Sequence, residues 1–188
     1  MKRAIGIFLL GWLMTAPAFG AAPNVASANY EVEVLVFETR LPDLEGSELW
    51  TRAGKPTDPT AITVESMPPS GDFASVMDAL RSDSHYHVLL HKHWMQSAES
   101  KSTGPAVLLS TDNNEVNGTL KFYLSRFLHV ELNVLYQPQS GAIGAAVSTN
   151  DGAPAYLISE QRRVKSNDMN YFDHPKFGVL VRISPVAG

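Results

Sequence analysis

The chain has 188 residues, of which 44% are hydrophobic, and it contains no cysteine. This length and apolar content suit one domain with an ordinary core, and the lack of cysteine excludes disulfides, thiol chemistry and a lipid-modified N-terminal cysteine. The balance of 15 basic against 19 acidic residues, without a basic cluster, argues against nucleic acid and anionic membranes as general partners.

The first twenty residues are predicted to be a secretory signal peptide. Lys2 and Arg3 precede an apolar run over residues 4–14, which is too short to span a bilayer, and small residues follow it. We expect cleavage after Gly20, with Ala18 as the alternative. Removal of Lys2 and Arg3 leaves 13 basic residues against 19 acidic ones, so the net charge becomes 13 − 19 = −6. The mature chain is therefore expected in the periplasm, without lipidation and without a membrane span.

The first element predicted in the mature chain is a strand over Tyr30–Glu38, with the sequence YEVEVLVFE. Apolar residues alternate with Glu31 and Glu33 in its first half, which indicates one solvated face. Its apolar second half indicates burial on both faces. Residues 41–70 follow and contain five prolines and two glycines. We predict a flexible loop there, with one short strand at residues 62–64.

One helix is predicted, over about residues 70–82. Ser70 or Asp72 can cap its N-terminus, and a polar run over residues 81–84 ends it. Its apolar residues recur at i, i+3, i+4 and i+7, so they form a single stripe that can pack on a sheet. The residues of this stripe are Phe73, Val76, Met77 and Leu80.

Four of the six histidines fall in the next predicted strand, Ser84–Trp94, with the sequence SHYHVLLHKHW. Alternation places two sets on opposite faces: His85, His87, His91 and His93 on one, and the core residues Tyr86, Val88, Leu90 and Trp94 on the other. A His-x-His pair can bind a metal ion, but the two pairs would lie about 20 Å apart in a straight strand. Further ligands would have to come from His129, Asp173 or His174. A solvated polar face is the favoured interpretation, and a metal site is the alternative.

Apolar residues recur at even-numbered positions throughout Gly118–Tyr136, and we call this alternation the apolar phase. One strand of that length would be about 60 Å long, so the chain must bend near Ser125 and Arg126. Neither residue favours the positive φ of a two-residue hairpin, so a sharply bent strand or a bulge is predicted. Arg126 lies in the apolar phase, either at the bend or buried with an ion-pair partner, and the ion pair is the favoured interpretation.

The remaining residues predict a glycine-rich flexible loop at residues 137–154 and two further strands, at residues 155–164 and 177–184. An aromatic-packed turn with the sequence NDMNYFDHP joins these strands. After a short linker at residues 21–29, residues 30–188 are predicted to form a single α+β domain. Its mainly antiparallel sheet would have five to seven strands, with the one helix packed on it.

No motif for catalysis or for a cofactor stands out. The chain lacks Gly-x-Ser-x-Gly, Ser-x-x-Lys, P-loop and dinucleotide-binding sequences. Paired carboxylates for glycosidic cleavage could come from Glu31, Glu33, Asp168 or Asp173, yet alternating glutamates on a strand are typical of a solvated edge. We therefore predict a protein that is not an enzyme and that needs no cofactor.

Three segments of the chain carry a family resemblance: YHVLLHKHWMQ (Tyr86–Gln96), LSRFLHVELNVLY (Leu124–Tyr136) and RRVKSNDMNYFDHPKFGVLVRISP (Arg162–Pro185). They resemble the CsiV family of exported peptidoglycan-binding proteins of gammaproteobacteria, which is named for cell-shape integrity. The strand YEVEVLVFE directly after a signal peptide also fits, so the resemblance covers most of residues 30–185. Its most specific part is the run Tyr-x-Asp-His-Pro-x-Phe-Gly-Val-Leu-Val near the C-terminus.

The resemblance implies a periplasmic protein that binds peptidoglycan and promotes its synthesis. It also implies stimulation of a bifunctional class A penicillin-binding protein, together with the outer-membrane lipoprotein activator of that synthase. No catalytic residue comes with the family. The positions that match its pattern are Tyr86, Leu89, His91, Trp94, Gln96, Arg126, Leu128, His129, Arg162, Arg163, Tyr171, Asp173, His174, Pro175, Phe177 and Gly178.

Chemistry and pattern together nominate eight residues for ligand binding: Trp94, Gln96, Arg126, His129, Arg163, Tyr171, Asp173 and His174. Trp94 or Tyr171 would stack on sugar faces, and Arg126 or Arg163 would bind a carboxylate. We therefore predict a periplasmic peptidoglycan-binding accessory factor of wall synthesis. The alternatives are a periplasmic metal-binding protein that uses the four clustered histidines, and an envelope interaction module without wall contact.

Overall fold

The computed structural model describes residues 28–40, 60–139 and 155–186. These ranges contain one helix and eight strands, and every ladder between the strands is antiparallel. The predicted class, mainly antiparallel β structure with one packed helix, is confirmed. The predicted signal peptide, most of the predicted linker and most of the predicted loops at residues 41–70 and 137–154 lie outside the described residues.

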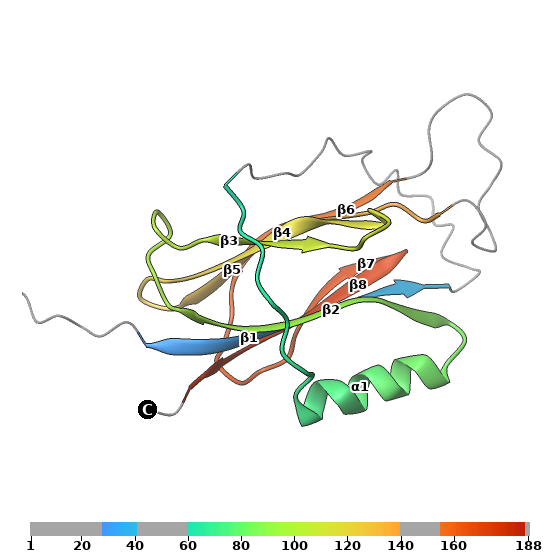
Figure 1. Cartoon of the computed structure of the whole chain (residues 1–188), viewed down its shortest axis with the longest axis horizontal. Helices are drawn as coiled ribbons and strands as arrows, with labels where there is room; N and C mark the ends of the chain where they lie inside the picture. Colours follow the sequence, from blue (N-terminus) through green and yellow to red (C-terminus); the bar gives the residue numbers. More distant parts are fainter. Residues whose placement is uncertain (1–27, 41–59, 140–154, 187–188) are drawn as a thin grey trace, which may run out of the picture.

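The eight strands form two four-stranded sheets, which Figure 1 shows as two layers with the helix beneath the lower one. Sheet A contains, in spatial order, β2 (Tyr86–Ser97), β1 (Asn29–Thr39), β8 (Phe177–Pro185) and β7 (Asn170–His174). Sheet B contains β3 (Ala106–Ser110), β4 (Val116–Leu124), β5 (Leu128–Tyr136) and β6 (Tyr156–Arg163). The helix is α1 (Gly71–Ser82). The sequence patterns do not predict β3, β7 or the division into two sheets.

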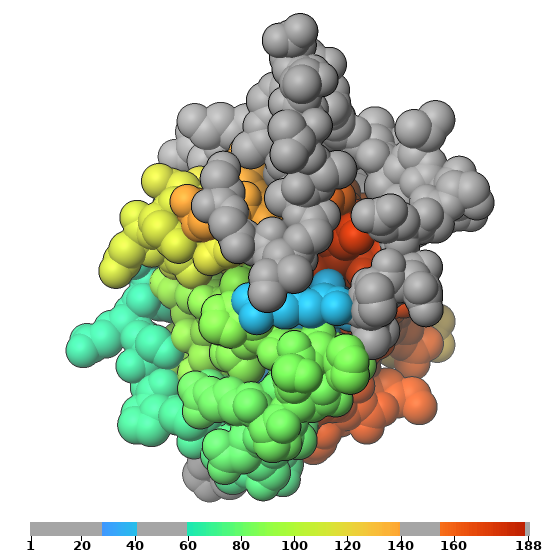
Figure 2. Space-filling view, turned by 90° about the vertical axis from the view of Figure 1, so that its right-hand side faces the viewer, coloured from blue at the N-terminus to red at the C-terminus, as the bar shows by residue number. Residues whose placement is uncertain are grey.

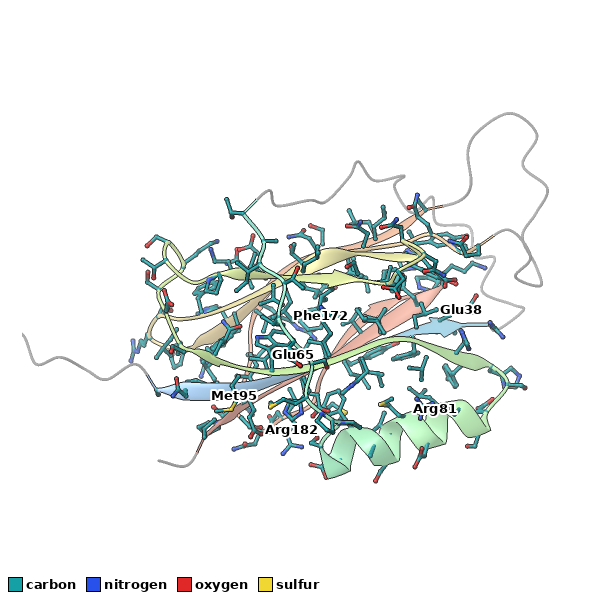
Figure 3. The ribbon with its side chains drawn as sticks, in the orientation of Figure 1. Glu38, Glu65, Arg81, Met95, Phe172 and Arg182 are labelled. Carbon is teal, nitrogen blue, oxygen red and sulfur yellow. The ribbon has the colours of Figure 1, made fainter. Side chains whose placement is uncertain are left out.

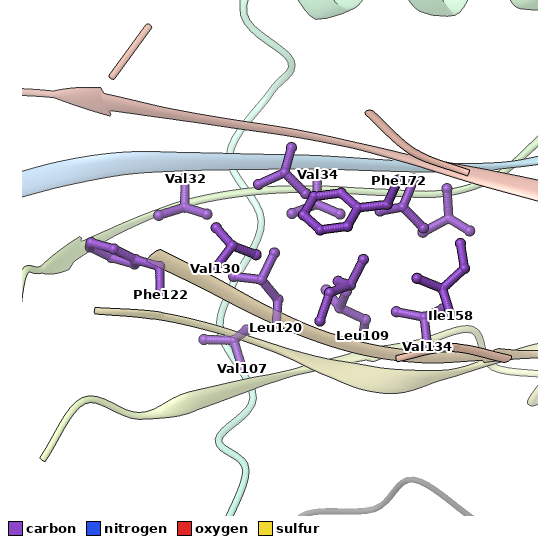
Figure 4. Packing of buried hydrophobic residues seen from close by; sticks show 14 of the residues in the cluster. Val32, Val34, Val107, Leu109, Leu120, Phe122, Val130, Val134, Ile158 and Phe172 are labelled. Atoms are coloured by element: carbon purple, nitrogen blue, oxygen red, sulfur yellow. The ribbon is translucent and has the colours of Figure 1, made fainter. Parts of the chain in front are cut away.

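The main core lies between the two sheets. Figure 4 shows side chains from the two sheets pointing toward one another in this layer. Val32 and Val34 of β1 are fully buried there, as are Leu120 and Phe122 of β4 and Val130 of β5. Side chains of a strand alternate between its faces, so the even-numbered residues of these strands all enter the same layer. The apolar phase that the sequence predicts is therefore the inner face of sheet B.

The opposite face of sheet A packs against α1. Phe73 and Met77, from the predicted apolar stripe, are buried against Leu35 of β1. Figure 2 shows the green residues of α1 and early β2 packed against the blue end of β1. Of the two predicted caps, Ser70 and Asp72, the helix uses Ser70, whose Oγ accepts a hydrogen bond from the Phe73 N–H (3.5 Å). The second half of β1 is thus buried on both faces, which confirms the prediction for this half of the strand.

The segment between residues 60 and 70 connects the edges of the two sheets (Figure 1). The Ile62 N–H donates to the Ala106 carbonyl of β3 (2.8 Å), and the Met67 N–H donates to the His93 carbonyl of β2 (2.7 Å). The strand predicted at residues 62–64 is a single parallel bridge between Ile62 and Val107. This segment carries the chain from sheet B across to the start of α1.

The bend near Ser125 is a hairpin, so the predicted bent strand or bulge is wrong. Leu124 pairs with Leu128, and residues 125–127 form the loop that joins β4 to β5. The Ser125 N–H donates to the Phe127 carbonyl (3.1 Å). In a hairpin with an odd number of loop residues, paired positions have the same parity, so the apolar phase stays on even numbers through the turn. For this reason the pattern resembles that of one long strand.

A β-bulge in β2 makes the predicted histidine face wrong. Val36 pairs with Leu90 whereas Phe37 pairs with Val88, so Leu89 is an extra residue on the β2 side. An extra residue shifts the alternation of side chains by one position. The two His-x-His pairs therefore fall in different phases of the strand.

His87 and His91 consequently point to opposite sides of sheet A. His91 and His93 lie on the side of α1, opposite Leu35 and Glu33 of β1. Leu90 and Trp94 enter the core between the sheets instead, as predicted for these two residues. His87 stays exposed near the start of β2.

Gly118 of β4 allows the close approach of β5. A Cβ atom on Gly118 would lie 2.1 Å from the Asn133 carbonyl oxygen, which belongs to the backbone and cannot move alone. We predict that Gly118→Ala lowers the free energy of unfolding in urea by about 1–3 kcal/mol. Gly71→Ala is the control, because a Cβ at Gly71 meets nothing within 4 Å. Its stability should be unchanged or slightly higher, and equal losses for the two variants would contradict the prediction.

Candidate functional site

Glu33 is buried beneath the start of α1, so the solvated face predicted for it is wrong. Only 3% of the residue is exposed. The Ser70 N–H donates to Glu33 Oε1 (3.0 Å), and the Ser70 hydroxyl donates to Oε2 (2.5 Å). His91 Nε2–H donates to Oε1 (2.8 Å). Because Ser70 caps α1, the carboxylate ties the helix to the middle of sheet A.

His93 continues this polar layer, and we call Glu33, Ser70, His91 and His93 together the Glu33 cluster. His93 Nδ1–H donates to the Pro68 carbonyl (2.7 Å). Burial alone would raise the pKa of Glu33, but the hydrogen bonds from His91 and Ser70 and the charge of His93 outweigh it and hold this pKa below 4.5. The Glu33 carboxylate is therefore an ionised anchor at neutral pH.

The clustered histidines have separate partners. His91 and His93 use ring nitrogens to hold Glu33 and Pro68, and His85 Nδ1 lies 2.7 Å from Asp83 Oδ1 in the turn after α1. Among the residues that the structure describes, no group of three or more His, Cys, Asp or Glu side chains is placed to hold a metal ion. The geometry therefore gives the four histidines no common ligand.

Of the nominated ligand residues, Trp94 belongs to the core between the sheets, and the half-buried Gln96 is its hydrogen-bond partner. Trp94 is 2% exposed, and its indole Nε1–H donates to Gln96 Oε1 (2.7 Å). The ring of Trp94 is covered by core side chains, so it cannot stack on a sugar. Gln96 serves as the hydrogen-bond acceptor for this indole.

Tyr171, Asp173 and His174 lie on β7, one of the two edge strands of sheet A, and do not form one site. The exposed Tyr171 donates its hydroxyl to Asp173 Oδ1 (2.7 Å), and its ring stacks on Phe37. His174 points to the opposite side, where its ring packs near Tyr156 and where burial lowers its pKa. Only Tyr171 and Asp173 of this group remain at the surface.

The other three nominated residues, Arg126, His129 and Arg163, meet at the β4–β5 hairpin on the outer side of sheet B. His129 pairs with Arg163 across β5 and β6, and with Tyr123 across β4 and β5. These paired residues have odd numbers, so their side chains point away from the core. No helix in the described part of the chain packs on this side of the sheet.

Phe127 lies in the hairpin loop and organises the cations around it. The residue is 38% exposed. The guanidinium carbon of Arg163 lies 3.4 Å from the ring centroid, and that of Arg126 lies 5.5 Å from it. His129 Nδ1–H donates to the Phe127 carbonyl (2.9 Å) and so fixes the loop against β5. Arg126 is thus at the bend and exposed, and the ion pair predicted for it is absent from the described residues.

Tyr123 supports this surface from beneath, since only 4% of the residue is exposed. Its ring stacks on His129 with 5.1 Å between centroids, and Lys101 Nζ lies 5.6 Å above the ring. Lys101 Nζ also donates to Gln161 Oε1 (2.8 Å) and lies 3.5 Å from a carboxylate oxygen of Glu131. We define the hairpin face as Lys101, Tyr123, Arg126, Phe127, His129, Gln161 and Arg163. It offers guanidinium groups, hydrogen-bond donors and the exposed aromatic side chain of Phe127, whereas Tyr123 is buried beneath its neighbours. These groups suit an anionic or sugar-like ligand.

The family of the chain follows from its sequence match over most of these elements. The family described as "Peptidoglycan-binding protein, CsiV" matches residues 64–186, which is more than half of the chain and includes the whole hairpin face. The chain belongs to the CsiV family. CsiV is a peptidoglycan-binding family and not an enzyme family, and its ligand implies the cell envelope. No curated protein matches the chain, and no solved structure does.

The CsiV match agrees with the absence of a catalytic motif but assigns no residue to a role. Within the described ranges, no helix is long and apolar enough to cross a membrane. Four residues of the hairpin face are not predicted from the sequence: Lys101, Tyr123, Phe127 and Gln161. The odd-numbered phase of Gly118–Tyr136 could have revealed Tyr123 and Phe127, because it interrupts a polar face with aromatic residues.

The Glu33 cluster of this CsiV-family chain predicts a pH-dependent stability. We expect Glu33→Gln to lower the free energy of unfolding at pH 7 by about 1–3 kcal/mol, because a charged hydrogen-bond acceptor is lost. A carboxyl whose pKa falls on folding stabilises the protein above its unfolded-state pKa, and this contribution disappears as the pH falls through the folded-state value. The difference between the two proteins should therefore be full at pH 7 and shrink as the pH falls below 4.5.

Urea denaturation over a series of pH values measures this difference. Glu65→Gln is the control, since Glu65 is exposed on the segment that leads to α1 (Figure 3). We expect the control to change stability by less than about 0.5 kcal/mol. A deficit for Glu33→Gln that stays constant from pH 7 to pH 3 would argue against the ionised anchor.

Proposed function

We propose that this chain is a periplasmic accessory protein that binds peptidoglycan through the hairpin face. In this proposal it promotes cell-wall synthesis by a class A penicillin-binding protein, together with the outer-membrane lipoprotein activator of that synthase. Membership of the CsiV family supports the binding of peptidoglycan. The predicted signal peptide supports the periplasm as its location.

One observation carries the assignment of the hairpin face. Arg126 and Arg163 both contact the exposed ring of Phe127, on a side of sheet B that no described helix covers. Peptidoglycan presents sugar hydroxyls, acetamido groups and peptide carboxylates. Guanidinium groups bind carboxylates in a bidentate manner, and aromatic rings pack on the apolar faces of sugars.

The other predicted functions have less support from the geometry. His91 and His93 are taken up by the Glu33 cluster, which leaves the metal-binding alternative without a shared ligand set. An envelope interaction module without wall contact predicts no affinity for purified wall. The binding experiment below separates this alternative from the proposal.

We predict that the mature protein co-sediments with purified sacculi and that Phe127→Ala weakens this binding by about tenfold. The alanine removes the ring that positions both arginines, and an interfacial aromatic side chain typically contributes about 1–2 kcal/mol or more. The measurement is the fraction of protein in the pellet as the amount of sacculi is varied.

Leu124→Ala is a matched control for this experiment. Leu124 ends β4 directly before the hairpin loop that contains Phe127, and both residues are 38% exposed. The control should bind sacculi like the wild type, and both variants should retain the wild-type thermal unfolding midpoint. Equal loss of binding in the two variants would remove the hairpin face from the proposal. A wild-type protein that stays in the supernatant would contradict direct wall binding.

The accessory role predicts an effect on wall synthesis in a purified system. Addition of the mature protein to a class A synthase and its lipoprotein activator should increase the rate of glycan polymerisation from lipid-linked precursor. Phe127→Ala should lose this effect if wall binding and stimulation use the same face. An unchanged rate with the wild-type protein, at concentrations that saturate sacculi, would exclude direct stimulation.

A further inference from the structure

The arginines of the described chain fall into two groups. Arg40, Arg81, Arg162 and Arg182 each have a carboxylate partner: Glu38, Asp78, Glu160 and Asp72 respectively. Arg126 and Arg163 have no carboxylate partner among the described residues, and both contact Phe127. Two arginines without a carboxylate partner are notable in this chain, because its acidic groups are in excess and its formal net charge is −4.

The contacts with Phe127 leave the binding edges of these guanidinium groups available. A guanidinium group that stacks on an aromatic ring uses its flat face, while its N–H groups point outward in the plane. Those N–H groups match the two oxygens of a carboxylate, and a pair of like charges near one ring favours an anion between them. Both side chains are exposed, so a ligand can reach them.

We propose that Arg126 and Arg163 bind carboxylates of the peptidoglycan stem peptide, so that the hairpin face recognises the peptide rather than the glycan. This inference rests on the proposed function. The glycan strands present hydroxyl and acetamido groups, and the carboxylates belong to the peptides. Lys101 does not serve this purpose, because Glu131 and Gln161 already hold its ammonium group.

The test compares the binding of wild-type protein to three forms of the wall. The first is intact sacculi. The second is peptide-free glycan strands, made by amidase digestion, in which the lactyl carboxylates exposed by this hydrolysis are also converted to methylamides. The third is sacculi whose carboxylates have been converted to methylamides with carbodiimide and methylamine. We expect binding to intact sacculi and a loss of about tenfold or more on each of the other two forms.

Two variants connect this difference to the arginines. Arg126→Gln with Arg163→Gln should bind intact sacculi about as weakly as the wild type binds methylamidated sacculi. Arg81→Gln removes one positive charge, against two in the double variant, from α1 on the opposite side of sheet A from sheet B (Figure 3). It should retain wild-type binding, so a loss in this control would indicate only a general effect of net charge and would overturn the inference. Unchanged thermal unfolding midpoints confirm that each variant folds.

Competition separates carboxylates from other anions. A free stem tripeptide should displace the wild-type protein from intact sacculi, whereas inorganic phosphate at the same concentration should not. Equal displacement by phosphate would overturn the preference for carboxylates. Equal binding to intact sacculi and peptide-free glycan would overturn the inference and leave the proposed function standing. Failure to bind intact sacculi would overturn both.

Discussion

The burial of β1 on both of its faces is the constraint on which the rest of this structure depends. Val32 and Val34 fill the layer between the sheets, and Leu35 packs against α1 on the other side. Glu33 shares that second side, and its carboxylate accepts hydrogen bonds from the helix cap Ser70 and from His91 at the same time. An apolar side chain at this position could fill the space but could not satisfy those donors. Sheet A is therefore covered by sheet B on one face and by α1 on the other.

This use of sheet A leaves the outer side of sheet B as the sheet surface that no described helix covers. The polar groups of the two sheets differ accordingly. In the Glu33 cluster, donors and acceptors satisfy one another beneath α1, which is a structural use of charge. On the hairpin face, Arg126 and Arg163 contact Phe127 and have no carboxylate partner in the described chain. Unpaired cations on an acidic protein are better suited to a ligand than to folding.

Local patterns were informative where one residue type recurs at one period. The stripe of Phe73 and Met77 predicts α1, and the even-numbered apolar phase predicts the inner faces of β4 and β5. Patterns failed at two places where the alternation of side chains does not reveal the path of the chain. Leu89 inverts the alternation of β2, and the odd loop at residues 125–127 preserves a phase across a reversal of the chain. Neither event requires glycine or proline, so neither leaves the usual mark in the sequence.

By itself, the sequence determined the helix, the strand segments other than β3 and β7, the lack of catalytic motifs and the resemblance to the CsiV family, because these depend on local periodicity and on contiguous motifs. Only the tertiary structure decided which polar residues are structural and which remain available. Glu33 and Glu31 look alike as alternating strand residues, yet α1 buries Glu33. Likewise, Arg126 and Arg163 are far apart in the sequence and meet at Phe127 because β4, β5 and β6 are neighbours in sheet B. Burial and partnership are properties of the packed chain, and no periodicity within a single segment encodes them.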